Sequence, residues 1–198
     1  MNQDTTRRSG GISVETAHIF PIIKKWLYSE KDIFLRELVS NAADAVTKHK
    51  RLVSLGEIES GEEESYRITV TLDKTAGTLT VSDNGIGMTE EEVTRYLGNI
   101  ALSGALDFIH KYEGEQEKNA ASGIIGHFGL GFYSAFMVAD SIEVITRSYT
   151  GGETVRWVCS ADGSYEFTDA PYALHRGTDI ILHVTEEESA YLSATKVK

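Results

Sequence analysis

The segment from residue 30 to residue 54 constrains the fold more than any other part of the chain. Its apolar side chains recur every three or four residues, which predicts one long helix that ends near Gly56. A helix with so broad an apolar face is stable only when that face packs against a second layer. The residues that supply much of the face are Ile33, Leu35, Leu38, Val39, Ala42, Ala45 and Val46.

The second layer is predicted to be a sheet. Residues 66–72 and 78–82 alternate apolar and polar side chains around a K-T-A-G turn, which predicts a β-hairpin. Further strands are predicted at 11–15, 141–148, 153–159, 164–168 and 178–184, and shorter helices at 16–28, 89–97, 103–112, 130–139 and 186–194. Helices and hairpins are mixed without strict β-α-β alternation. We therefore expect an α+β fold, a two-layer sandwich whose mostly antiparallel, mixed sheet is covered on one face by helices.

The composition is that of a folded, acidic protein. Of 198 residues, 41% are hydrophobic and 25% are charged, which excludes wholesale disorder. The formal net charge of −11 repels phosphate backbones, so we expect no nucleic-acid partner. The one cysteine, Cys159, cannot form an internal disulfide, and no zinc-binding spacing is present. With no secretory signal, no membrane-spanning apolar run and no linker that divides residues 1–198, we expect a single cytoplasmic domain without a membrane partner.

A polar stripe runs along the predicted long helix beside its apolar face. Glu37, Asn41, Asp44 and Lys48 are spaced four, three and four residues apart, which places them on one side. One interpretation is a solvated stripe with an i, i+4 ion pair between Asp44 and Lys48. The other is a magnesium site. Asn41 would offer a neutral amide oxygen to Mg²⁺, and Glu37, one turn away, would orient or deprotonate a water.

The motif V-S-D-N-G-I-G-M, residues 81–88, follows the second strand of the predicted hairpin. D-N-G is common in ordinary tight turns. However, Gly85 and Gly87 also allow the backbone to approach a flat ligand closely. The Asp83 carboxylate would then accept a hydrogen bond from an exocyclic amine such as that of adenine, and would disfavour guanine, whose O6 is an acceptor.

A second glycine motif, G-H-F-G-L-G-F-Y-S-A-F, spans residues 126–136 and opens a predicted helix. Gly126, Gly129 and Gly131 would leave backbone N–H groups free to bind an anion, although such glycines are often structural. A polar stretch at 111–123 precedes the motif and is interpreted as a functional loop. The P-loop signature, the dinucleotide fingerprint and the protein-kinase motifs are all missing from the sequence.

Together and in this order, the motifs resemble the N-terminal nucleotide domain of the ninety-kilodalton heat-shock chaperone family. The segments that carry the resemblance are R-E-L-V-S-N-A-A-D-A, D-N-G-I-G-M and G-H-F-G-L-G-F-Y-S-A-F, with I-F-P-I-I-K-K-W-L-Y-S-E-K-D-I-F-L-R-E-L before them and R-G-T-D-I-I-L-H-V after them. The resemblance covers essentially the whole chain and implies the Bergerat-type, or GHKL, ATP-binding fold. DNA gyrase B subunits, MutL-type repair proteins and sensor histidine kinases belong to the same superfamily.

The resemblance implies a role for each matching residue. Glu37 matches the glutamate that activates water, Asn41 matches the asparagine that binds Mg²⁺, and Asp83 matches the aspartate that binds adenine. Thr178 matches a threonine in the same water network. Residues 98–128 match a mobile lid. The other residues that would contact ATP or ADP are Asp44, Ala45, Lys48, Gly87, Met88, Leu97, Ser103, Gly104, Gly126, Phe128, Gly129, Leu130, Gly131 and Phe132.

The chain departs from the family at two positions near the expected phosphate site. Family members commonly carry a lysine where this chain has Leu102, and many carry an asparagine where it has Tyr96. We therefore expect the phosphates to be neutralised by Mg²⁺, by backbone N–H groups and by groups outside this chain. The resemblance places one such group, a catalytic arginine, in a middle domain, so we expect this chain to be the N-terminal part of a longer protein.

The resemblance implies a Mg²⁺-dependent ATPase domain of a stress-response chaperone that binds client proteins. Lid closure and homodimerisation through a C-terminal domain would accompany its ATP cycle. The alternative is the ATPase domain of a gyrase B or MutL-like protein, which the net charge and the F-Y-S-A-F segment disfavour. A sensor kinase would generally lack a glutamate four residues before Asn41, and a nucleotide-binding module without turnover is the simplest remaining interpretation.

Overall fold

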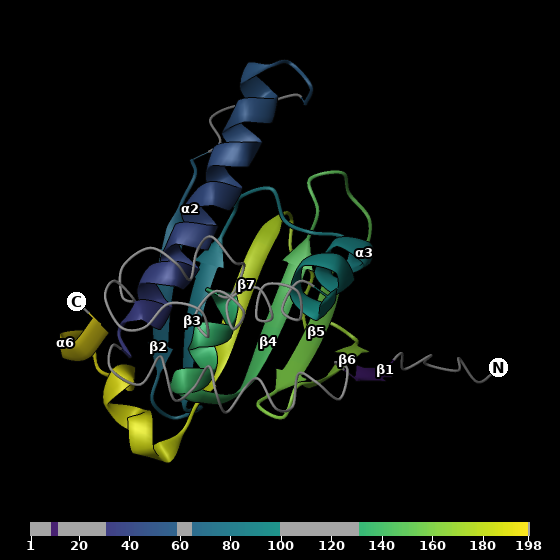
Figure 1. The fold of residues 1–198 in the computed structure, drawn as a ribbon. Helices are drawn as coiled ribbons and strands as arrows, with labels where there is room; N and C mark the ends of the chain where they lie inside the picture. Colours follow the sequence, from purple (N-terminus) through teal and green to yellow (C-terminus); the bar gives the residue numbers. More distant parts are fainter. Residues whose placement is uncertain (1–8, 12–30, 59–64, 100–130, 198) are drawn as a thin grey trace, which may run out of the picture.

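Seven strands form one sheet in the order β1-β6-β5-β4-β7-β3-β2 (Figure 1). The computed structural model describes residues 9–11, 31–58, 65–99 and 131–197. The strands are β1 (Ser9–Gly11), β2 (Ile68–Asp73), β3 (Thr78–Asp83), β4 (Ala139–Arg147), β5 (Val155–Ser160), β6 (Ser164–Thr168) and β7 (Gly177–Val184). Every pairing between the described strands is antiparallel.

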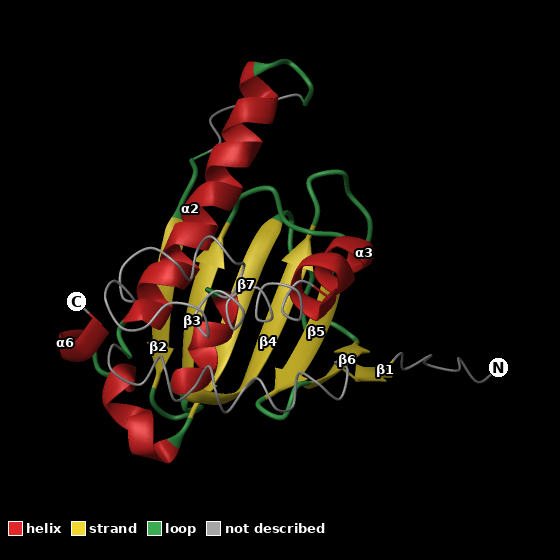
Figure 2. Cartoon of the chain, viewed as in Figure 1, coloured by secondary structure: helices red, strands yellow, loops and turns green. Residues whose placement is uncertain are grey.

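The predicted α+β sandwich is confirmed. The long helix α2 (Ile33–Ser54) crosses one face of the sheet, and the shorter described helices lie in the same layer or at its edge (Figure 2). These are α3 (Glu90–Val93), the π-helix η1 (Thr94–Asn99), the 3-10 helices η2 (Phe132–Met137) and η3 (Glu186–Leu192), and α6 (Ala194–Val197). Buried side chains from both layers form the core, among them Phe34, Leu38, Leu79, Val81, Val144, Trp157 and Leu182.

The order of the strands brings distant parts of the chain together. The hairpin of β2 and β3 forms as the alternating pattern predicts, with Val70 opposite Val81. Strand β7 then pairs with β3 on one side and with β4 on the other. As a result, the last strand of the sequence, β7, lies inside the sheet, beside the strand that ends at Asp83.

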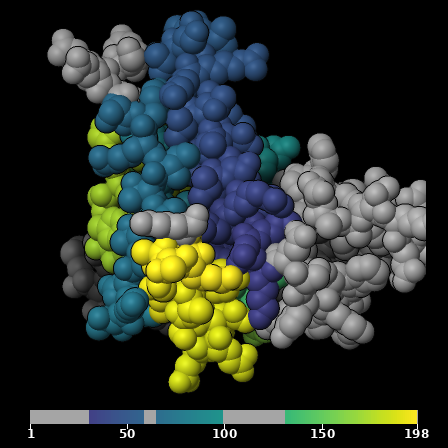
Figure 3. Space-filling view, turned by 90° about the vertical axis from the view of Figure 1, so that its left-hand side faces the viewer, coloured from purple at the N-terminus to yellow at the C-terminus, as the bar shows by residue number. Residues whose placement is uncertain are grey.

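The C-terminal segment fixes the first turn of α2. The Tyr191 hydroxyl of η3 donates a hydrogen bond to Asp32 Oδ1 at 2.6 Å, and the Tyr191 ring meets Phe34 edge to face at 5.2 Å between centroids. In the space-filling view this segment lies against the N-terminal end of α2 (Figure 3). The same turn leads to Glu37, so the two chain segments together hold the part of α2 that carries this carboxylate.

Three predicted helices differ from the structure in kind, and one of them, at 89–97, is a single α-helical turn that continues as a π-helix. Instead of one helix over 130–139, the chain forms a short 3-10 helix over 132–137 and enters β4 at Ala139. All six residues of η2 are buried, so no solvated face exists to support an amphipathic helix. The segment 186–194 likewise forms a 3-10 helix over 186–192. The predicted helices at 16–28 and 103–112 lie outside the described residues.

Candidate functional site

Three polar side chains from neighbouring strands form a row on the face of the sheet that α2 covers. Asp83 of β3 lies opposite Thr178 of β7, and Thr178 lies opposite Thr146 of β4. Side chains alternate along a strand, so Asp83 points to the same side as the buried Val81. The row therefore interrupts an apolar layer with one carboxylate and two hydroxyl groups.

The Asp83 carboxylate is half-buried and strongly influenced by its surroundings. Its Oδ1 accepts a hydrogen bond from the Gly85 N–H at 2.7 Å. Burial raises its pKa from the ordinary value of 3.8 to about 6, against the opposing effect of that hydrogen bond. The charge of Asp179 adds to the rise in pKa, and that of Arg176 opposes it. A carboxyl group whose pKa is raised by burial is often found at a functional site.

The two glycines of D-N-G-I-G-M are required by close backbone packing. A Cβ on Gly85 would lie 2.5 Å from the carbonyl carbon of Ala45 in α2, and the Ile86 N–H donates to the Ala45 carbonyl oxygen at 3.1 Å. Gly87 has a φ of 63°, and a Cβ there would overlap the carbonyl oxygen of Arg147. The loop after Asp83 is thus held between α2 and β4.

The polar stripe of α2 runs along the same layer. Glu37 is half-buried, whereas Asn41, Asp44 and Lys48 are exposed. Gly131 lies directly against Glu37, since a Cβ at this glycine would be 2.6 Å from Glu37 Oε2. The structure therefore brings together the predicted catalytic glutamate and the last glycine of the second glycine motif.

The remaining described residues of the predicted site differ in surroundings. Ala45, Met88 and Leu97 are half-buried, and the last two pack against the core. Phe132 is only 5% exposed and packs edge to face on Tyr133, so its ring belongs to the core. Ser103, Gly104, Gly126, Phe128, Gly129 and Leu130 lie outside the described residues, as do Leu102 and nearly all of the predicted lid at 98–128.

Sequence reasoning missed Thr146. Its hydroxyl lies 2.9 Å from the hydroxyl of Thr178, and it accepts the Met88 N–H at 3.0 Å. It therefore joins the loop after Asp83 to the row of polar side chains. The signal was a threonine at an inward position of β4, where Ile142 and Val144 are the preceding inward residues. A buried hydroxyl among apolar neighbours indicates a specific hydrogen-bonding role.

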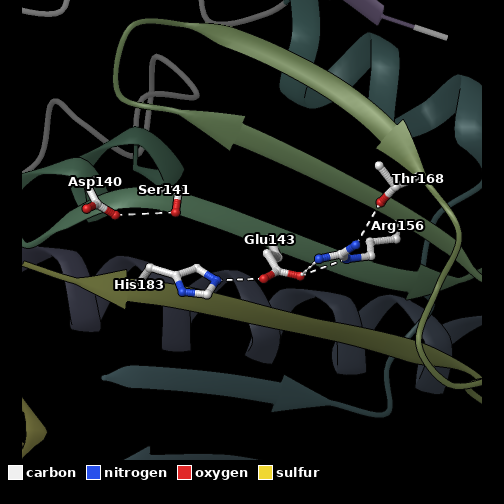
Figure 4. Close-up of polar contacts among 6 residues, drawn as sticks. All are labelled: Asp140, Ser141, Glu143, Arg156, Thr168 and His183. Carbon is white, nitrogen blue, oxygen red and sulfur yellow. Dashed lines mark hydrogen bonds and ion pairs between the residues drawn. The ribbon is translucent and has the colours of Figure 1, made fainter. Parts of the chain in front are cut away.

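A separate ionic cluster lies on the opposite face of the sheet and is not part of this site. Glu143 accepts a hydrogen bond from Arg156 Nε at 2.8 Å and contacts His183 Nε2 at 2.6 Å (Figure 4). Burial alone would raise the pKa of Glu143, but the contacts with His183 and Arg156 hold it below its ordinary value. Because its neighbour Val144 points into the core, Glu143 faces away from α2.

An open groove of about 1390 Å³ lies near the ends of β5 and β6, away from the row of Asp83. None of its lining residues belongs to the predicted site. Both of its arginines are engaged by the protein itself. Arg147 donates to the carbonyl oxygens of Gly152 and Leu174, and Arg156 binds Glu143. The candidate site is therefore assigned to the row of Asp83 and the adjoining face of α2.

Comparison with known proteins finds a family and several relatives that match most of this chain. The sequence profile of a family described as "Histidine kinase-, DNA gyrase B-, and HSP90-like ATPase" matches residues 28–176. Chaperone protein HtpG of Porphyromonas gingivalis strain W83 is 51% identical over 193 residues, which are 96% of this chain and 27% of that protein. HtpG of Bacteroides fragilis strain YCH46 is 50% identical over 192 residues, with 96% and 27% covered.

A more distant relative is also an HtpG chaperone. HtpG of Actinobacillus pleuropneumoniae serotype 5b is 43% identical over 195 residues, which are 98% of this chain and 31% of that protein. The chain thus spans about 27% to 31% of the length of these curated relatives. Among the described residues, no helix combines the length and the apolar character that crossing a bilayer requires.

Proposed function

Because the chain belongs to the histidine kinase-, DNA gyrase B- and HSP90-like ATPase family, we propose that it binds ATP at the row of Asp83 and hydrolyses it with Glu37. The observation that carries the proposal is the half-buried Asp83 carboxylate beside Thr178, on the face of the sheet that α2 covers. Such a carboxylate needs a hydrogen-bond donor to offset its lost hydration. The exocyclic amine of adenine is a donor of this kind.

The chemistry of the row favours adenine over guanine. An ionised Asp83 accepts hydrogen bonds and donates none, so it attracts the 6-amino group of adenine and repels the 6-oxo group of guanine. The close packing of Gly85 against α2 and of Gly87 against β4 fixes the loop beside Asp83. Met88 and Leu97, which the resemblance assigns to the nucleotide, are half-buried and pack against the core.

For hydrolysis, Glu37 would orient and deprotonate the attacking water. Its half-buried position beside Gly131 supports this role, since a catalytic base must be close to the phosphates yet reachable by water. Asn41 lies one helical turn later and is exposed, with an amide oxygen that suits Mg²⁺ when phosphate oxygens supply the negative charge. Bound Mg²⁺ would neutralise charge on the phosphates, and residues 98–128 would close over them as a lid.

We extend the proposal to the role of a chaperone. The relatives named above are chaperones, but this chain covers less than a third of their length. Client binding, dimerisation, a contribution from an arginine outside this chain and a cytoplasmic location therefore remain parts of the proposal. A gyrase B or MutL-like function is not favoured, because the named relatives are chaperones and the net charge is −11.

Calorimetric titration of the chain tests the nucleotide site. The chain should bind ADP and ATP, and should bind GDP at least tenfold more weakly, because the base contact is a buried hydrogen bond to a charged group. Asp83→Asn should weaken ADP binding by one to two orders of magnitude while the protein stays folded, since the new amide presents a donor to the 6-amino group. Equal affinity of the parent and a folded Asp83→Asn variant for ADP would refute the assignment of Asp83.

A further inference from the structure

The hydroxyl of Thr146 is fully buried and has three polar neighbours. Its Oγ1 lies 3.0 Å from the Met88 N, 3.0 Å from the Gly177 carbonyl oxygen and 2.9 Å from the Thr178 Oγ1. Thr146 itself has no exposed surface, whereas Thr178 is 5% exposed. The contacts join three parts of the site: the loop after Asp83, β4 and the start of β7.

These three contacts leave one arrangement of the hydroxyl protons. A hydroxyl group has one proton to donate and two lone pairs with which to accept. The Met88 N–H can only donate, so it occupies one lone pair of Thr146. The Gly177 carbonyl can only accept, so it receives the Thr146 proton. The remaining lone pair of Thr146 must then accept the proton of Thr178.

The orientation of the Thr178 hydroxyl follows from this arrangement. Strand β7 lies between β4 and β3, so a proton directed at Thr146 points away from Asp83. Toward the candidate base site, Thr178 then presents only lone pairs. Asp83, when ionised, also presents only lone pairs. Two acceptors therefore lie side by side on adjacent strands, and neither side chain has a proton to offer a ligand.

We propose that Thr146 is a positioning residue that sets base specificity by holding the hydroxyl of Thr178 as an acceptor. The inference rests on the proposed nucleotide site and deepens it. Two adjacent acceptors match a 6-amino purine, either directly or through a water that donates to Thr178. They oppose a 6-oxo purine, which presents an acceptor at the same place. Without the Thr146 hydroxyl, Thr178 is free to turn its proton toward the ligand and to accommodate the oxo group.

The test compares ADP with inosine diphosphate, which carries a 6-oxo group and an N1–H where ADP carries a 6-amino group and a bare N1. Thr146→Val keeps the shape and removes the hydroxyl, whereas Thr146→Ser keeps the hydroxyl. In Thr146→Val the ratio of the affinity for ADP to that for inosine diphosphate should fall by about fivefold to tenfold, the effect of one net hydrogen bond. In Thr146→Ser the preference should stay within twofold of the parent. Calorimetry supplies the affinities, and urea unfolding shows that each variant is folded.

Removing the Thr178 hydroxyl shows whether Thr146 acts through it. Thr178→Val and the double variant Thr146→Val/Thr178→Val should show the same preference within twofold, because Thr146 then has no hydroxyl to orient. If Thr146→Val acted only through a loss of packing, it would change the preference for ADP by the same factor with and without the Thr178 hydroxyl. If Thr146→Val does not fold, Thr146→Cys replaces it, and its weakly hydrogen-bonding thiol should narrow the preference in the same direction.

The outcomes separate this inference from the function on which it rests. A parent that prefers ADP, together with a folded Thr146→Val or Thr146→Cys variant that keeps the full preference, overturns the role of Thr146 alone. The role of Thr146 is also overturned if Thr146→Val narrows the preference for ADP by the same factor in the presence and in the absence of the Thr178 hydroxyl. A parent that binds neither nucleotide, or binds both equally, overturns the proposed adenine site and this inference with it.

Discussion

Replacing Asp83 by Asn should change how the stability of the folded chain depends on pH. Burial raises the pKa of Asp83 from 3.8 to about 6, so the folded chain holds this proton more tightly than the unfolded chain. The stability due to the bound proton is complete below pH 3.8 and is lost as the pH rises through about 6. At about 1.4 kcal/mol per pH unit, the full loss is about 3 kcal/mol, of which about 2.5 kcal/mol falls between pH 4 and pH 7.5.

The assay is urea unfolding of the parent and of Asp83→Asn without nucleotide across this pH range. Relative to the variant, the parent should lose about 2.5 kcal/mol of unfolding free energy from pH 4 to pH 7.5. Any constant cost of the new amide cancels in this comparison. Asp162→Asn is the control, because the hydrogen bonds from Ser164 lower the pKa of Asp162. Relative to this variant, the change in the unfolding free energy of the parent between pH 4 and pH 7.5 should have the opposite sign. A difference for Asp83→Asn that does not vary with pH would refute the reasoning.

Three further variants test the catalytic and glycine positions. Glu37→Ala should keep ADP affinity within about threefold but lower ATP turnover by about 10²–10⁴-fold, because a general base acts in the transition state. Turnover is measured by phosphate release, and unchanged turnover would remove Glu37 from this role. Gly131→Ala should also lower turnover, since its Cβ would lie 2.6 Å from Glu37 Oε2, and unaltered kinetics would contradict this contact. Gly87→Ala should destabilise the fold by at least about 3 kcal/mol in urea unfolding, because φ is 63° and the Cβ would meet the Arg147 carbonyl. Gly56→Ala is its control, with φ of 72° and open space, and should cost only about 1 kcal/mol; equal costs would contradict the packing argument.

Local patterns predicted the elements that carry most of the fold. The apolar spacing of residues 30–54 gave α2, and alternation with a turn gave the hairpin of β2 and β3. These patterns depend on residues that are close in the sequence, so contacts with distant segments do not change the elements that they predict. The prediction over 130–139 was wrong in kind, because F-Y-S-A-F-M is buried on every side and the usual contrast between two helix faces is missing.

The site depends on contacts that no local pattern encodes. Asp83 and Thr178 meet only because β7 pairs with β3, and alternation along a strand does not identify its neighbours. The pairing of Asp83 with Thr178 as site residues came from the resemblance to a family and not from spacing. Thr146 was missed for the same reason, since its role requires β4 to lie on the other side of β7.

The central claim is that a half-buried, ionisable Asp83 binds adenine, and the most direct test is an NMR pH titration of its side-chain carboxyl carbon. The resonance is assigned by its loss in Asp83→Asn. Without nucleotide, the pKa of Asp83 should be about 6. With saturating ADP it should fall below about 5, because N–H donors on the carboxylate favour its ionised form. A pKa near 3.8 in the free chain, or one that ADP leaves unchanged, would contradict the account.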